Sequence, residues 1–245
     1  FFHECGSLII MAKSIEKKTN LIVSKCQASN IPVERMSSEA IEYHWPYVKM
    51  PNITGGVEGL FEHQMAGYID PRKLVAAQLT LFQNVGGELI RGTVIKVEKN
   101  QRLNLWEVYV LINGQTDIVY SKQIVVAAGS FVNHNQILPP GCQLELYAFT
   151  EPNLLFEIAP DDLELMQNMP TIITVDPENT DNKNMSIYLL PPIKYPDGKW
   201  YAKIGPGMQP IVQQLDSLEQ MRQWYLQQQI TQQQRDFLMQ MKHLL

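Results

Sequence analysis

Hydrophobic and polar positions near the start of the chain follow the pattern of a short strand and two helices. Apolar residues run together in Ser7–Met11, which predicts a strand, and recur at roughly helical spacing from about Ser14 to Ser29, which predicts a helix. Asn30-Ile31-Pro32 ends that helix, because the residue before a proline disfavours helical backbone. Ser37-Ser38-Glu39-Ala40 offers an N-cap serine for a second, short helix that ends before Trp45-Pro46.

The clearest helix start in the chain is Asp70-Pro71. Asp70 is an N-cap residue, and proline at the first helical position loses no hydrogen bond there. Gly86-Gly87 supplies the stop signal. Upstream, three glycines divide residues 52–66 into short extended pieces, Gly59-Leu60-Phe61 among them, which we interpret as a loop-rich connection. The apolar positions of the predicted helix, spaced three or four residues apart, are Leu74, Ala77, Leu81 and Val85.

After this helix, the hydrophobic pattern changes to the period of two residues that is typical of strands. Glu88–Ile90 and Thr93–Val97 read as strands, and apolar and more polar residues alternate from Trp106 to Ile112. Asn113-Gly114 is a strong two-residue hairpin signal. The pattern predicts a β-meander.

The next segment has the composition of a buried parallel strand. In Lys122–Phe131 the chain reads K-Q-I-V-V-A-A-G-S-F, so the apolar residues Ile124–Val126 run directly into two alanines and a glycine. Small residues at the carboxyl end of such a strand let the backbone approach a ligand closely. We therefore expect the latter part of a dinucleotide-binding domain here.

Beyond Pro139-Pro140-Gly141 strands follow one another without intervening helices, which predicts a mostly antiparallel sheet in a second domain. We expect Ser7–Met11 to share that sheet with Thr171–Val175. The tail from Leu215 to Leu245 has helical period. The predicted strands are Leu144–Phe149, Leu154–Ile158, Thr171–Val175, Ser186–Leu190 and Trp200–Ile204.

Composition narrows the class of protein. The chain has 245 residues, 45% of them hydrophobic, enough for a substantial core. Its net charge of -5 is scattered, which argues against nucleic acid or an anionic membrane as a partner. No apolar run approaches the roughly 20 residues that cross a bilayer. Three isolated cysteines indicate free thiols in a reducing compartment, so we predict a soluble, intracellular protein without a metal site.

The sequence contains no G-x-G-x-x-G motif, the usual cradle for a pyrophosphate, and begins at Phe1. We interpret the chain as a fragment that lacks both this motif and a C-terminal segment. As expressed here it should be inactive and should not hold a dinucleotide tightly.

The order of motifs resembles the FAD-dependent amine and amino-acid oxidoreductases typified by D-amino-acid oxidase and monomeric sarcosine oxidase. The resemblance covers nearly the whole chain. It rests on Gly6-Ser7-Leu8, Trp45-Pro46, Gly67-Tyr68-Ile69-Asp70-Pro71, Gly86-Gly87 with Val94, and Val125-Val126-Ala127-Ala128-Gly129.

The resemblance implies the fold and the cofactor, FAD. The fold class would be α/β plus α+β: a partial, Rossmann-like, three-layer FAD-binding domain interleaved with a mostly antiparallel-sheet substrate domain. Residues 1–66 and 141–245 would form the substrate domain and residues 67–140 the FAD-binding part. Val94 would lie under the adenine, and Ala127, Ala128 and Gly129 would lie against the diphosphate and ribitol.

The resemblance also implies a catalytic residue. The family's active-site tyrosine matches Tyr188, whose phenol would orient a substrate amine or carboxylate over the flavin. Sarcosine oxidase-like members carry a histidine where this chain has Gly207, which makes sarcosine itself a poor substrate.

These observations lead to one leading hypothesis and two alternatives. The leading hypothesis is a fragment of an FAD-dependent oxidoreductase that oxidises a C–N bond of a small amine or amino acid by hydride transfer to flavin, with oxygen as acceptor. One alternative is an amine dehydrogenase that passes electrons to a carrier. The other is a non-catalytic binding or scaffold protein derived from this fold.

Overall fold

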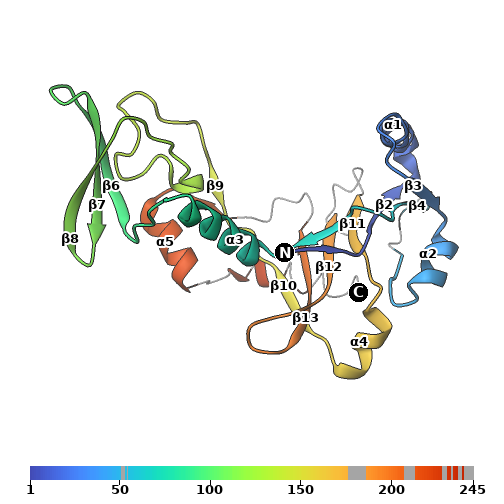
Figure 1. The fold of residues 1–245 in the computed structure, drawn as a ribbon. Coiled ribbons are helices and arrows are strands. Elements are labelled where there is room, and N and C mark those ends of the chain that lie inside the picture. The colour runs from blue at the N-terminus through green and yellow to red at the C-terminus, as the bar shows by residue number, and fades with distance from the viewer. Residues whose placement is uncertain are drawn as a thin grey trace. The chain divides into compact units, whose positions relative to one another are not determined.

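The computed structural model describes residues 1–50, 53, 55–175, 186–206, 213–227, 231, 232, 234–236 and 239. The chain forms two compact units, each made of segments distant in sequence (Figure 1). Unit 1 comprises Phe1–Leu74, Glu151–Val212 and Ile230–Leu245, and unit 2 comprises Val75–Thr150 and Gln213–Gln229. Which of the predicted domains binds FAD and which binds substrate stays a prediction.

Unit 1 is built on a seven-stranded sheet (Figure 1). Neighbouring strands pair antiparallel except β2 and β11, which run parallel with Leu8 opposite Ile172. The expectation that these two segments share a sheet is confirmed, as is the mostly antiparallel pairing. In order across the sheet the strands are β10 (Leu154–Glu157), β13 (Trp200–Pro206), β12 (Ile187–Lys194), β11 (Thr171–Val175), β2 (Ser7–Ala12), β4 (Val57–Glu62) and β3 (Val33–Met36).

Strand β4 corrects one prediction. Residues 52–66 were expected to be a loop-rich connection with Gly59-Leu60-Phe61 as one short extended piece, but the strand is longer, and β4 pairs with both β2 and β3. Gly59 pairs with Ile10 and Met36 in this strand, and a Cβ there would lie 2.7 Å from Ile41 Cδ1. The glycine thus makes room for the helix that covers the sheet, rather than marking a loop.

Short helices and a second, small sheet complete unit 1. Ser37 caps α2 as expected, its hydroxyl oxygen accepting a hydrogen bond from Ala40 N at 3.2 Å. Asp70 caps α3 with bonds from Arg72 N and Lys73 N. Strands β1 (Phe2–Glu4) and β5 (Gly67–Ile69) pair antiparallel. The helical segments are η1 (Lys13–Ile15), α1 (Glu16–Ala28), α2 (Ser38–His44), α3 (Pro71–Asn84), which runs on into unit 2, and α4 (Pro160–Met166).

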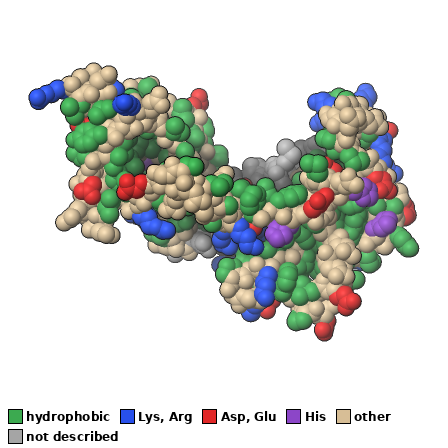
Figure 2. Space-filling view, in the orientation of Figure 1, with side chains coloured by type: hydrophobic (Ala, Val, Ile, Leu, Met, Phe, Trp, Pro, Cys, Tyr) green, Lys and Arg blue, Asp and Glu red, His purple; other side chains and the backbone are tan. Residues whose placement is uncertain are grey.

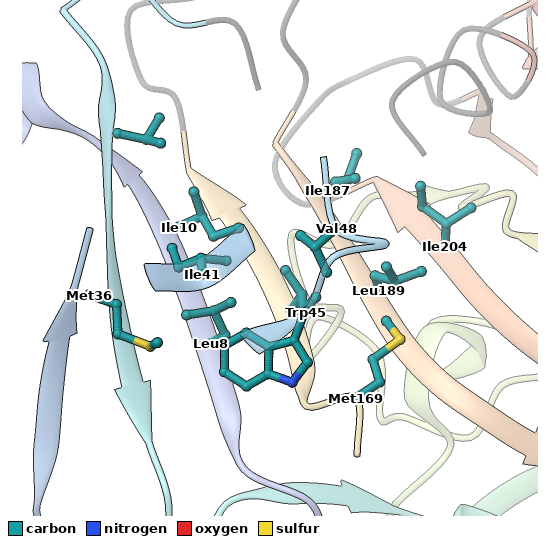
Figure 3. Packing of buried hydrophobic residues seen from close by; sticks show 12 residues of the cluster. Leu8, Ile10, Met36, Ile41, Trp45, Val48, Met169, Ile187, Leu189 and Ile204 are labelled. Carbon is teal, nitrogen blue, oxygen red and sulfur yellow. The ribbon is translucent and has the colours of Figure 1, made fainter. Parts of the chain in front are cut away.

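The core of unit 1 lies on one face of the large sheet (Figure 3). Trp45 is its largest side chain, 7% exposed, and its Nε1 donates to Asn168 O at 3.1 Å. Its ring meets that of Phe61 edge to face at 5.0 Å. Trp45 therefore ties the end of α2 to the loop before β11. The clustered buried residues are Leu8, Ile10, Met36, Ile41, Trp45, Val48, Val57, Met169, Ile172, Ile187, Leu189 and Ile204.

Unit 2 contains the predicted meander. Strands β6, β7 and β8 pair antiparallel, and Asn113 and Gly114 both have positive φ, +50° and +84°, as a tight hairpin requires. Its elements are β6 (Thr93–Asn100), β7 (Leu105–Ile112), β8 (Gln115–Ser121), η2 (Gly129–Phe131), the paired β9 (Ala148–Phe149) and β14 (Gln214–Leu215), and α5 (Leu218–Gln227).

Three strand predictions in unit 2 are wrong. Glu88–Ile90 forms no strand, and of Leu144–Phe149 only the last two residues do. Ile124–Val126 is not the expected buried strand: it joins no described ladder, and Val125 is 90% exposed. An apolar strand of a parallel sheet is buried only when neighbours pair with it and cover its faces. No described strand does so here.

Two further findings concern the chain ends and the membrane. The helical tail is described as α5, and most of its continuation to Leu245 lies outside the described residues. None of the helices that the structure describes has the length and apolar character needed to cross a bilayer.

Candidate functional site

Tyr188 lies on the face of the large sheet opposite the core. Its neighbours in β12, Ile187 and Leu189, are each 6% exposed and belong to the core cluster, and side chains alternate between the two faces of a strand. Across the sheet Tyr188 pairs with Ile173 of β11 and Gly205 of β13. The tyrosine is half-buried, as expected of a side chain on a partly open face.

Gly205 makes room for the tyrosine ring. A Cβ built on Gly205 would overlap both the Tyr188 ring and Asn153 Oδ1. The ring therefore lies across the backbone of β13, where any larger residue would push it away. This contact fixes the position of the phenol relative to the sheet.

The hydroxyl of Tyr188 has a defined hydrogen-bonding role. Its Oη donates to Asn153 Oδ1 at 2.5 Å, while Asn153 Nδ2 donates to Glu151 O at 3.2 Å. Because its single hydrogen is used by Asn153, the phenol oxygen presents its lone pairs as acceptors. The arrangement suits a ligand that brings N–H donors to this face.

Lys203 adds a positive charge beside the tyrosine. Its Nζ lies 5.4 Å from the centroid of the Tyr188 ring, within range of a cation–π interaction. Lys203 precedes Gly205 by two residues in β13 and so lies on the same face. Sequence reasoning missed this lysine, although its position between the buried residues Ala202 and Ile204 was a signal that it faces away from the core.

Sequence reasoning also missed Asn153, and the residues around it do not indicate that it lies beside Tyr188. It lies 35 positions from Tyr188, just before the short strand β10. Only the pairing of β10 with β13 and of β13 with β12 brings the amide to the phenol.

In unit 2 the structure brings Val94 close to the turn that follows Gly129. Val94 pairs with Val110 of β7, and its carbonyl accepts a hydrogen bond from Asn135 Nδ2 at 3.4 Å. Val97 N donates to Gln136 O at 3.1 Å. These bonds hold residues 135–136 against β6, and the register of β6 shifts between Val94 and Lys96.

The segment Ala127-Ala128-Gly129 is open to close approach. Ala127 and Gly129 are exposed and Ala128 is half-buried. Gly129 has φ +55°, and no atom lies within 4 Å of a Cβ built on it. Small side chains and open space beside Gly129 fit one wall of a site for FAD.

The predicted residues fall in two units. Tyr188 belongs to unit 1, and Val94, Ala127, Ala128 and Gly129 belong to unit 2. The assigned roles of all five residues remain predictions. Gly207, expected where relatives carry a histidine, lies outside the described residues.

Comparison with solved structures shows the same fold in three oxidases or dehydrogenases. L-proline dehydrogenase from P. horikoshii matches with TM-score 0.59 at 15% identity, over 91% of this chain and 54% of that one. The deglycating fructosamine oxidase from Aspergillus fumigatus matches with TM-score 0.59 at 15% identity, over 84% and 44%. L-alpha-glycerophosphate oxidase from Mycoplasma pneumoniae, solved with FAD bound, matches with TM-score 0.50 at 17% identity, over 89% and 51%.

These likenesses establish a mixed α/β fold of the FAD-binding type, and the chain spans about half the length of the structures it matches. No curated protein sequence matches the chain. The family described as DAO, FAD dependent oxidoreductase, matches residues 1–241. The chain therefore belongs to the DAO family of FAD-dependent oxidoreductases, whose cofactor is FAD.

Proposed function

We propose that the protein carrying this chain oxidises the C–N bond of a small amine or amino acid. The observation that carries this proposal is the hydrogen bond from Tyr188 to Asn153, because it leaves the phenol oxygen as an acceptor on the open face of the sheet. An amine brings N–H donors that such an oxygen binds.

Family membership alone does not select this reaction. Two of the structures with this fold are a proline dehydrogenase and a fructosamine oxidase, and a third is a glycerophosphate oxidase. Nitrogen and oxygen substrates therefore both occur among them. The acceptor at Tyr188 suits nitrogen, because an amine or ammonium brings two or three N–H donors to it where a hydroxyl brings one O–H.

Lys203 favours an amino acid over a simple amine. Its ammonium lies beside the Tyr188 ring on the same face. A positive charge next to the amine-binding phenol suits a substrate that carries a carboxylate. We propose that Tyr188 orients the nitrogen and Lys203 the carboxylate.

The residues proposed to contact the cofactor lie in unit 2. The backbone of Ala127, Ala128 and Gly129 would pass close to it, with Val94 under its adenine. FAD, when bound, supplies the hydride acceptor for the reaction. The task of Tyr188 and Asn153 is to hold the substrate nitrogen in one orientation, which lowers the entropy cost of reaching the reactive geometry.

The test uses Tyr188→Phe in the natural, FAD-loaded protein that carries this chain. Loss of one hydrogen bond to the substrate should lower kcat/KM for amines and amino acids by about 10-fold, with flavin content unchanged. Tyr43→Phe is the matched control, since Tyr43 is 84% exposed and lies on α2 of the same unit. Peroxide formation in air, compared with reduction of an artificial dye, measures whether oxygen is the acceptor.

Two results would contradict the proposal. One is unchanged kinetics in Tyr188→Phe. The other is turnover of alcohols or hydroxy acids but of no amine. A Lys203→Met variant separates the substrate classes: it should raise KM for amino acids and leave KM for amines without a carboxylate nearly unchanged.

A further inference from the structure

A pocket in unit 1 is separate from the face that carries Tyr188. It encloses about 440 Å³, within the range of small-molecule sites, and its walls come from β1 and β5, from α4 and the loop after it, and from the ends of β12 and β13. Tyr188, Asn153 and Lys203 do not line it. The proposed amine oxidation makes no use of this pocket.

Three aromatic rings line the pocket. His3 and Tyr68 are opposite each other in the β1–β5 pair, and their rings stack with centroids 4.8 Å apart and an angle of 11°. Trp200 contributes the third ring and is 37% exposed. Its backbone is fixed, because its carbonyl accepts a hydrogen bond from Ile158 N at 2.8 Å and its residue pairs with Lys194.

A bulge in β12 shapes the wall beneath Trp200. The register of β12 against β13 shifts between Leu190 and Ile193, and the two residues between them, Pro191 and Pro192, line the pocket. Proline lacks an N–H and therefore fits a bulge, where a ladder bond is missing. The wall is apolar and has a fixed backbone.

The formally charged lining residues are both acidic, Glu4 and Glu164. Glu4 Oε1 accepts a hydrogen bond from Met65 N at 2.8 Å, which holds the carboxylate and leaves its second oxygen for a ligand. Among the residues that the structure describes, neither carboxylate forms an ion pair with a lysine or arginine. Burial raises the pKa of the Cys5 thiol, so this lining group is uncharged at neutral pH.

We propose that this pocket binds a small organic cation, an ammonium group that carries apolar carbon. The faces of Tyr68 and Trp200 attract a cation through their quadrupoles, and the two carboxylates add a negative potential. An anion would meet Glu4 and Glu164, and none of the described residues that line the pocket is a lysine or arginine that would offset them. An uncharged apolar ligand would gain from the rings but not from the carboxylates.

The binding test uses the 245-residue chain without FAD and choline as the probe. Choline is titrated by calorimetry and by tryptophan fluorescence, beside its uncharged isostere, in which a quaternary carbon replaces the nitrogen. We expect choline to bind with a dissociation constant on the order of 1 mM, and the isostere at least about fivefold more weakly. The quaternary nitrogen of choline has no lone pair, so choline is not a substrate of the proposed C–N oxidation. If choline fails to bind, that result contradicts the pocket proposal and does not bear on the proposed oxidation.

Two variants and two controls locate the binding. Trp200→Leu should weaken choline about tenfold, and Glu164→Gln about threefold with a smaller dependence on salt. Glu164 is exposed on α4, so its variant tests the site even if Trp200→Leu fails to fold. Tyr43→Leu and Glu42→Gln, on α2 and outside the pocket, should bind choline as the parent does.

Three outcomes would overturn the proposal. The first is equal binding of choline and its isostere, which would make the pocket merely apolar. The second is the absence of binding at tens of millimolar. The third is unchanged choline affinity in both Trp200→Leu and Glu164→Gln.

Discussion

The two units differ in how they bury their hydrophobic residues. Unit 1 packs twelve of them into one cluster against its sheet, among them Leu8, Ile41 and Ile204 at 0% exposure. In the described part of unit 2 the buried hydrophobic residues are Val110, Val132, Ile137 and Met221. Large apolar side chains there lie open instead, as on α3, where Leu81 is 66% exposed. Figure 2 shows hydrophobic side chains on the visible surface of both units.

The difference shows that a segment can form regular secondary structure without burying a hydrophobic core. The meander of unit 2 forms from neighbouring strands joined by tight turns, so its backbone bonds need no distant segment. The sheet of unit 1 joins segments distant in the chain and carries the cluster of buried hydrophobic residues on one face. We expect the stability of unit 1 to come from packing and that of unit 2 mainly from backbone pairing.

The largest expected effect comes from deleting a core side chain. Leu8→Ala should lower the free energy of unfolding by about 3 kcal/mol, because it leaves a cavity among fully buried neighbours. Leu81→Ala, the matched change on exposed α3, should alter it by less than about 0.5 kcal/mol. Urea unfolding followed by circular dichroism measures both. Equal costs would break the comparison, since they would mean that Leu81 is covered in solution.

The next largest effect is a difference between the two units in their rates of limited proteolysis. Chymotrypsin should cut unit 2 at Tyr147 or Phe131, which are 60% and 37% exposed, about tenfold faster than it cuts beside Trp45 in unit 1. Mass spectrometry of the first fragments identifies the sites. Early cleavage beside Trp45 would show that the core of unit 1 opens as readily as unit 2.

The smallest effect concerns the helix shared by the two units, α3, which begins at Pro71 in unit 1 and continues into unit 2. The pKa of Asp70 is lowered, chiefly because its carboxylate accepts a hydrogen bond from the backbone N–H of Lys73. A carboxyl whose folded pKa is lowered stabilises the fold above its unfolded pKa, and that contribution is lost as the pH falls through the folded value.

We therefore expect α3 to fray as the pH falls below about 4. Helical circular dichroism over this range measures it. Asp70→Asn keeps a capping oxygen but does not titrate, so its helix signal should lack this component of the pH dependence. An identical acid transition in parent and variant would assign the change to other groups.

Local signals in the sequence predicted most of the helices and the meander, but helix α4 (Pro160–Met166) was missed, because strands without intervening helices were expected there. Ser37 and Asp70 cap helices where expected, and Asn113-Gly114 turns the hairpin, because each of these features depends on residues within a few positions. Residues whose environment is set from far away were harder to interpret. Gly59 lies within a strand, where Ile41 leaves no room for a larger side chain. Val125 is exposed although its neighbours are typical of a buried strand.

The residues of the candidate site likewise divide into those that the sequence could indicate and those whose environment is set by distant segments. Tyr188 was found through a resemblance that runs along the chain, and its side of the sheet agrees with alternation in β12. Asn153 could not be found, because two strand pairings intervene between it and the phenol. The charge pattern of the pocket was equally hidden, since its lining residues come from four distant segments.

The parallel pairing of β2 with β11 has a consequence for synthesis of the chain. Residues 7–11 bond to residues 171–175, so the ribosome must release the whole intervening sequence before the two strands meet. Until then β2 has an unpaired edge beside its antiparallel partner β4, while the local contacts of the meander are already able to form. Nascent chains should therefore acquire the meander first and depend on chaperones to keep the edge of β2 from aggregating.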